Sequence, residues 1–134
     1  MKQVKFLMVA LMLAMSSAAN AQLTKEQYRA ILEDFCISYY EDAFGGKQYI
    51  EGTLKVTSVE INPSTGVYTV LGTHSYRGRY FPFWGRETHL DKRFKAEVSE
   101  TRYGRKIKFW KWRDADPLNP KADFEGPCVK TIIP

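Results

Sequence analysis

The first regular pattern of the chain is helical and lies between residues 24 and 44. Apolar side chains recur there at spacings of three and four residues, as on the buried face of an α-helix. They are Tyr28, Ile31, Leu32, Phe35 and Tyr39. Thr24 and Gln27 have the spacing of a capping box, which marks a helix start. Gly45-Gly46 favour a helix end, so we expect one amphipathic helix between Thr24 and Gly45.

Beyond residue 48 the pattern alternates with a period of two, which is typical of β-strands. One strand begins near residue 48, and a β-rich run covers residues 67–76. Between them, Asn62-Pro63-Ser64-Thr65-Gly66 consists of residues that favour a turn. These two strands form a first predicted hairpin.

A second hairpin is predicted from residues 88–101 and 106–113, which are joined around Tyr103-Gly104. The inward positions of its first strand are Leu90, Phe94, Ala96 and Val98. In its second strand, alternation places Ile107, Phe109 and Lys111 on one face and Lys108, Trp110 and Trp112 on the other. Residues 114–127 contain three prolines and little periodicity, so we expect a loop there and a short last strand near residues 128–133.

This order of elements predicts an α+β domain, in which the N-terminal helix packs on a four- to five-stranded antiparallel sheet of two hairpins. In outline, one helix followed by hairpins is similar to the architecture of cystatin-like domains. The inhibitor motifs of that family are not found in the sequence, so the resemblance covers element order only and implies no activity. A small curled barrel is the alternative architecture.

Residues 1–21 have the three parts of a secretory signal peptide. Lys2 and Lys5 precede an apolar run over residues 6–15, and small residues then lead to Ala19-Asn20-Ala21. Ten apolar residues are too few to span a bilayer. We therefore expect cleavage after Ala21, a single exported domain over residues 22–134 without a transmembrane segment, and a periplasmic or secreted location.

Two cysteines, Cys36 and Cys128, lie in the exported part of the chain. An even number of cysteines in an exported protein is usually a sign of disulfide bonding. The sequence therefore predicts a bond between Cys36 and Cys128. A zinc or redox site fits less well, because the chain has no CxxC motif.

The charge of the chain is only mildly basic once the leader is set aside. The formal net charge is +5 for all 134 residues, and removal of Lys2 and Lys5 lowers it to +3. Four acidic residues, Glu87, Asp91, Glu97 and Glu100, lie among the basic residues of the second half. Nucleic-acid binding is not expected, because such proteins carry a stronger basic surface.

Residues 76–86 are the least ordinary stretch of the sequence, with five aromatic residues and three arginines in eleven positions. Aromatic and arginine side chains are typical of binding surfaces, because they bury much area at a low entropy cost. We take Arg79, Tyr80, Phe81, Phe83, Trp84 and Arg86 as the candidate ligand-binding residues. In the alternative interpretation, the large rings close the open end of the sheet as part of the core.

Trp110 and Trp112 are additional binding candidates, because alternation places both on one strand face. If the helix covers the opposite face, the two indoles form a ladder that can stack on a sugar or a partner side chain. If the sheet curls over them, they belong to the core.

The sequence contains little catalytic chemistry. His74, His89 and Asp91 are weak candidates for a metal or acid-base cluster, if their strands pair, but no HxH or HExxH spacing links them. No cofactor is expected. The favoured function is a non-catalytic binding or inhibitor-type module for a protein or glycan in the cell envelope or outside the cell. The alternatives are a small periplasmic hydrolase or metal-dependent enzyme at those three residues, and a structural envelope component.

Overall fold

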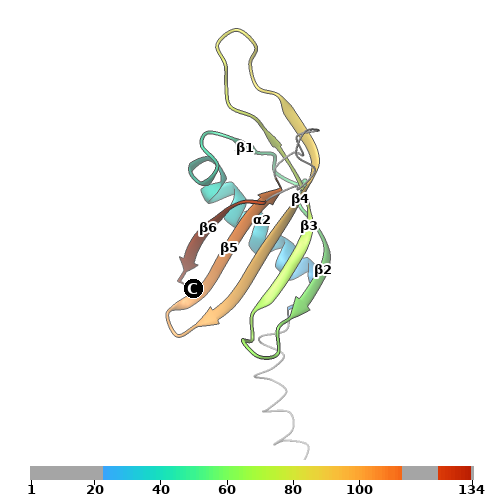
Figure 1. Cartoon of the computed structure of the whole chain (residues 1–134), viewed down its shortest axis with the longest axis vertical. Coiled ribbons are helices and arrows are strands. Elements are labelled where there is room, and N and C mark those ends of the chain that lie inside the picture. The colour runs from blue at the N-terminus through green and yellow to red at the C-terminus, as the bar shows by residue number, and fades with distance from the viewer. Residues whose placement is uncertain (1–22, 113–123, 134) are drawn as a thin grey trace, which may run out of the picture.

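The computed structural model describes residues 23–112 and 124–133. One helix packs on an antiparallel sheet that curls into a half-barrel, so the protein has the expected α+β architecture and also the curl of the alternative. The helix crosses one face of the sheet, and one hairpin projects far beyond the rest of the sheet (Figure 1). Within the described part of the chain, no helix is both long and apolar enough to cross a bilayer.

Helix α2 (Lys25–Ala43) begins at the predicted capping box. The Gln27 N–H donates to Thr24 Oγ1 at 3.1 Å, and the Thr24 N–H donates to Gln27 Oε1 at 2.8 Å. Two backbone donors at the helix start are thereby satisfied. The helix ends at Phe44, and Gly45 follows with a φ of +63°, a conformation that glycine adopts without strain.

Six strands follow the helix within the described residues, and neighbours in sequence pair almost throughout. They are β1 (Gln48–Tyr49), β2 (Lys55–Ile61), β3 (Tyr68–Arg77), β4 (Thr88–Thr101), β5 (Gly104–Trp112) and β6 (Phe124–Ile132). The main order is β1-β3-β4-β5-β6, and β2 also pairs with β3. The two predicted hairpins are therefore parts of one continuous meander, because β3 and β4 pair as well.

Two boundaries differ from the sequence prediction. The first predicted strand is divided into β1 and β2 by a turn at residues 50–54. The last strand begins at Phe124, so residues 124–127 belong to β6 rather than to the predicted loop. The remainder of that loop up to residue 123, and the predicted signal peptide over residues 1–21, lie outside the described residues.

The core lies between the helix and the inner face of the sheet and is mostly aromatic. The Phe109 ring on β5 stacks on Phe35 of the helix at 5.7 Å and on Phe94 of β4 at 5.2 Å between ring centres. The other large buried residues include Tyr28, Leu32, Tyr40, Leu54, Val70, Tyr76 and Ile107. Burial of these side chains is the main source of stability for the fold.

The expected inward position of Leu90 is wrong, whereas Phe94, Ala96 and Val98 are buried as predicted. Leu90 is 64% exposed. The register of β3 and β4 shifts at this point, and Asp91 takes a φ of +52°. An irregularity of this kind interrupts the alternation, so that positions on either side of it need not share a face.

The predicted disulfide is not formed in this structure, in which Cys36 and Cys128 are free thiols. Cys36 lies buried in the core, and Cys128 packs against that core from β6, opposite Phe109. Both therefore behave as small apolar side chains, a role for which a cysteine needs no bond. Burial raises the pKa of the Cys36 thiol well above its ordinary value, which disfavours the reactive thiolate.

Candidate functional site

Between β3 and β4 the chain continues as a narrow hairpin extension, residues 78–87, that projects away from the helix and the other strands (Figure 1). At its base the Gly78 N–H donates to the Glu87 carbonyl at 2.7 Å. At its far end Phe81 and Gly85 exchange backbone hydrogen bonds of 2.9 and 2.8 Å, and the Trp84 N–H donates to Phe81 at 3.2 Å. The extension is therefore an ordered hairpin with a tight turn.

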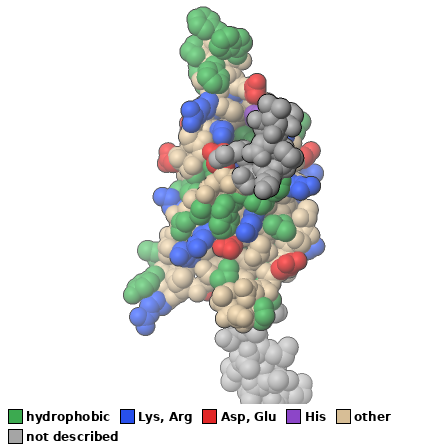
Figure 2. All heavy atoms as spheres, viewed as in Figure 1, with side chains coloured by type: hydrophobic (Ala, Val, Ile, Leu, Met, Phe, Trp, Pro, Cys, Tyr) green, Lys and Arg blue, Asp and Glu red, His purple; other side chains and the backbone are tan. Residues whose placement is uncertain are grey.

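Four aromatic side chains, Tyr80, Phe81, Phe83 and Trp84, form what we call the aromatic tip. Phe83 and Trp84 are 89% and 82% exposed, and Tyr80 and Phe81 are more than half exposed. The Trp84 ring makes edge contacts with Phe81 at 6.5 Å and with Phe83 at 6.2 Å. Figure 2 shows hydrophobic side chains gathered at this end of the molecule. The interpretation of these rings as a core plug is therefore wrong.

The two arginines of the candidate set hold the base of the extension against the loop that follows the helix. The guanidinium of Arg79 lies so close to Gly45 that a Cβ there would come within 2.7 Å of its Nη2 atom. Arg86 Nη1 donates to the Gly46 carbonyl at 3.4 Å and to Gln48 Oε1 at 3.5 Å. Arg79 and Arg86 thus orient the hairpin extension, and the aromatic tip carries the exposed surface.

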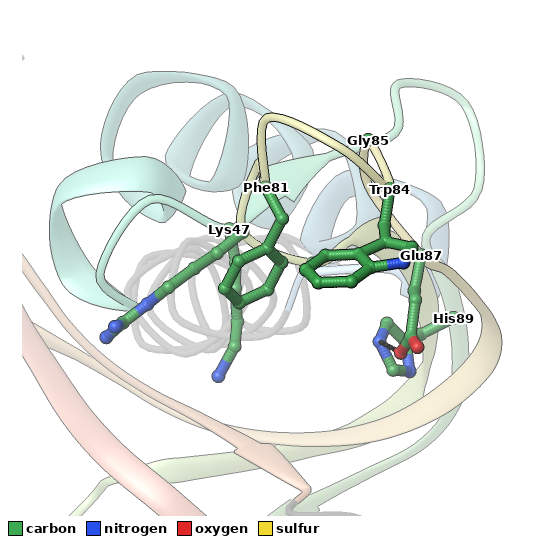
Figure 3. Close-up of a pocket in the computed structure, with 8 residues that line it drawn as sticks. Lys47, Phe81, Trp84, Gly85, Glu87 and His89 are labelled. Carbon is green, nitrogen blue, oxygen red and sulfur yellow. Dashed lines mark ion pairs between the residues drawn. The ribbon is translucent and has the colours of Figure 1, made fainter.

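Below the tip lies an open hollow of about 460 Å³ (Figure 3). Phe81 and Trp84 lie side by side above it, with Lys47 on one side and Glu87 and His89 on the other. Gly78, Arg79 and Gly85 complete its lining. Aromatic rings therefore cover the hollow from above, and a lysine lines one of its sides. On the other side, His89 Nε2 lies 3.7 Å from Glu87 Oε2.

Lys47 belongs to this surface but was not among the sequence candidates. Its Nζ lies 3.3 Å from Glu125 Oε2, and the same carboxylate oxygen lies 2.9 Å from Nζ of Lys111. Lys111 is buried on the inner face, as its alternation with Phe109 predicts. Desolvation lowers the pKa of Lys111, although the bond to Glu125 opposes that shift. A lysine on the buried face of a strand needs a carboxylate to pair with its charge. The inward position of Lys111 in the alternating pattern is therefore the sequence signal that predicts such a partner.

His74 is a core residue and not a free ligand. Its Nε2 lies 2.9 Å from the Tyr40 hydroxyl, and its Nδ1 lies 2.8 Å from the Lys92 carbonyl. Both ring nitrogens are therefore engaged in hydrogen bonds. Burial lowers the pKa of His74 from its ordinary 6.5 to about 4, so the ring is neutral at physiological pH.

The other two members of the weak metal or acid-base candidate lie in different surroundings. The His89 ring stacks on Tyr76 at 4.8 Å between ring centres. Asp91 is exposed, and its N–H donates to the Ser75 hydroxyl at 3.0 Å. Among the described residues, no three His, Cys, Asp or Glu side chains are grouped so that they could hold a metal ion. The structure therefore does not group His74, His89 and Asp91 as the enzyme alternative requires.

Trp110 and Trp112 lie on the face of β5 opposite to Phe109, and both are half-buried. Lys95 Nζ lies 4.9 Å from the centre of the Trp110 ring, and the Arg93 guanidinium lies 5.4 Å from that of Trp112. The Phe124 ring also meets Trp112 edge-on at 4.6 Å. Neighbouring side chains thus cover both indoles, so they are less accessible for ligand stacking than the aromatic tip.

Comparison with protein-family models, with curated proteins and with solved structures finds no match to this chain. The functional inference therefore depends on the geometry of the chain itself.

Proposed function

We propose that this protein is an exported, non-catalytic binding module that contacts its partner through the aromatic tip. Export would follow removal of residues 1–21, and the partner would lie in the cell envelope or outside the cell. The proposal includes an inhibitor-type role, in which the projecting tip would block a site on the partner.

The observation that carries this proposal is the exposure of four neighbouring rings at the end of an ordered hairpin. A soluble monomer seldom leaves a large apolar patch uncovered, and such patches are usually interaction sites. Large aromatic side chains also dominate the energetics of binding surfaces. The internal hydrogen bonds of the extension hold the rings in place, so their binding would cost little additional ordering.

Two features of the surrounding structure also support a binding role. Arg86 donates to Gly46 and Gln48, and the Arg79 guanidinium lies against Gly45, which favours a fixed orientation of the hairpin. The exposed rings make contacts mainly with one another, so their removal is not expected to disturb the core. A role as a structural envelope component would use the same surface in a permanent assembly.

The test is binding of the purified protein to isolated cell envelope, compared with the double variant Phe83→Ala, Trp84→Ala. We expect the bound fraction of the variant to fall at least ten-fold, with an unchanged melting temperature. A matched control is Tyr103→Ala, because Tyr103 is also an exposed ring at a hairpin turn beside an arginine. That control should bind like the wild type.

Two results would contradict the proposal. Equal binding of the wild type and the double variant would mean that the tip is not the contact surface. A large fall in the melting temperature of the variant would assign the rings a structural role. In that case the single variant Phe83→Ser, at the most exposed position, repeats the test with a smaller change.

A further inference from the structure

We propose that the surface recognised by the aromatic tip is a lipid bilayer with anionic headgroups. This inference rests on the proposed function, because it takes the tip as the contact surface and names what the tip contacts. In the bound state, Phe83 and Trp84 lie among the headgroups and the upper acyl chains. The folded body stays in water.

The composition of the tip suits the interface between membrane and water. Tyr80, Phe81, Pro82, Phe83, Trp84 and Gly85 follow one another without a charged side chain. Tryptophan and tyrosine favour the interface between membrane and water, because their rings are apolar while their N–H or O–H group stays hydrated. Phenylalanine adds apolar area that can be buried beneath the headgroups.

The backbone of the turn is largely hydrogen-bonded within itself. A backbone N–H that enters an apolar phase without a partner costs free energy, so inserted segments must satisfy these groups internally. In residues 81–85, Pro82 has no N–H, and three of the other four N–H groups donate within the turn. This pattern suits a segment that leaves water, whereas a turn on a wet protein surface has no such requirement.

The charge below the rings is mainly positive. Residues 77–88 contain three arginines, Arg77, Arg79 and Arg86, against the single carboxylate of Glu87. Within the described part of the chain, Arg86 bonds the neutral oxygens of Gly46 and Gln48 and no carboxylate. Figure 2 shows basic side chains, together with one acidic side chain, below the hydrophobic end of the molecule. When the rings insert, these cations face the phosphate level of an anionic leaflet.

The shape of the hairpin extension favours a bilayer over a protein partner. The tip is a convex end that projects along the long axis of the molecule (Figure 1). A protein partner would need a cavity shaped to these four rings, whereas a bilayer accepts them in any orientation about that axis. Interfacial segments sink only about 5–10 Å, so a projecting hairpin reaches this depth before the body makes contact.

The experiment measures co-sedimentation with lipid-only vesicles of phosphatidylglycerol and phosphatidylcholine, compared with vesicles of pure phosphatidylcholine. The protein is isolated after export and its N-terminus is determined by mass, so that wild type and variants share the same first residue. We expect at least ten-fold stronger binding to the anionic vesicles. Phe83→Ala, Trp84→Ala should lose this binding at least ten-fold, and Tyr103→Ala should keep it.

A second variant reports the position of the tip itself. Trp84→Phe keeps an apolar ring, so it should bind the anionic vesicles within about two-fold of the wild type. If Trp84 enters the interface, addition of vesicles shifts the indole fluorescence of the wild type to the blue, and Trp84→Phe loses this shift. Trp110 and Trp112 remain in that variant, so a persistent shift would contradict insertion of the tip.

The outcomes separate this inference from the proposed function. Tip-dependent binding to cell envelope without binding to either kind of vesicle would overturn the bilayer and leave a protein or glycan as the partner. Vesicle binding that is equal in the wild type and the double variant would overturn the inference that the tip contacts the bilayer, and the cell-envelope test would then decide the proposed function by itself. Loss of folding in the double variant moves the vesicle test to Phe83→Ser, for which the same results decide.

Discussion

The interior between helix and sheet and the hairpin extension are built from the same kinds of residue but place them differently. In the interior, rings meet rings, and polar groups meet partners, as in the hydrogen bond between Tyr40 and His74. In the extension, the backbone is paired while the rings of Phe83 and Trp84 point into solvent. Aromatic content alone therefore does not distinguish a core from a contact surface; the number of neighbouring elements does.

The boundary between the two regions is abrupt. Tyr76 is almost fully buried, whereas Tyr80, only four residues later, is exposed. Tyr40 of helix α2 packs against the Tyr76 ring, and β1 pairs with β3 as far as Arg77. Beyond that point only the two strands of the hairpin face each other, and a two-stranded ribbon has no second layer in which to bury a ring.

The largest expected effect contrasts one phenylalanine from each region. Phe109→Ala removes a ring that packs against Phe35 and Phe94, so we expect the free energy of unfolding to fall by about 3–5 kcal/mol. Phe83→Ala should change it by less than about 0.5 kcal/mol, because exposed substitutions away from packed features have little effect. Urea unfolding at equilibrium measures both variants.

The comparison between the regions would fail if the two variants lost similar stability. A large loss in Phe83→Ala would mean that the tip packs against part of the protein in solution. A small loss in Phe109→Ala would mean that the interior relaxes around the missing ring.

Much of the fold could be predicted because its signals are local. The capping box needs only Thr24 and Gln27, and the buried positions of β4 and β5 follow from alternation. Leu90 could not be placed, because the irregularity at Asp91 is held by Ser75 on the neighbouring strand. The turn between β1 and β2 is equally non-local, since Glu33 of the helix bonds the Tyr49 hydroxyl beside it.

The next effect in size is a loss of stability in acid that arises from the interior. The pKa of His74 is about 4 when folded, against 6.5 ordinarily, so between these values the unfolded chain binds more protons. Stability therefore falls as the pH drops from 6.5 to 4 and is fully present above 6.5. The loss is about 3 kcal/mol, because one pKa unit corresponds to about 1.4 kcal/mol.

Urea unfolding at several pH values checks this prediction in the wild type and two variants. His74→Gln retains a polar side chain but does not titrate, so its stability should vary less over this range. Phe83→Ala, which removes an exposed ring and no titratable group, should keep the slope of the wild type. An equal slope in His74→Gln would show that carboxylates, and not the buried histidine, cause the acid dependence.

The sequence predicted which residues form the candidate site, but it did not predict that their rings are exposed. Tyr80, Phe81, Phe83 and Trp84 all lie in the stretch that composition marks as unusual, and all reach the tip. Their exposure depends on how far β3 and β4 continue beyond β1, which local pattern does not encode. The anchoring roles of Arg79 and Arg86 depend on the distant loop at Gly45-Gly46, and the hollow includes Lys47 for the same reason.

The smallest expected effect concerns the joint between the two regions. Arg86→Ala removes two long hydrogen bonds to Gly46 and Gln48, which is a loss of about 0.5–1 kcal/mol at most. Because these bonds join the extension to the loop after the helix, the loss should appear as local opening. Amide exchange of Gly78, whose N–H bonds Glu87 across the base, should accelerate roughly two- to five-fold.

Arg105→Ala is the matched control, because Arg105 bonds Glu100 at the opposite end of the sheet. It should leave the exchange of Gly78 unchanged. If Arg86→Ala also leaves it unchanged, the extension is held by its own backbone pairing and by Arg79 alone. The orientation of the aromatic tip would then depend on the close approach of Arg79 to Gly45, without a contribution from Arg86. The hairpin would behave as a unit separate from the interior.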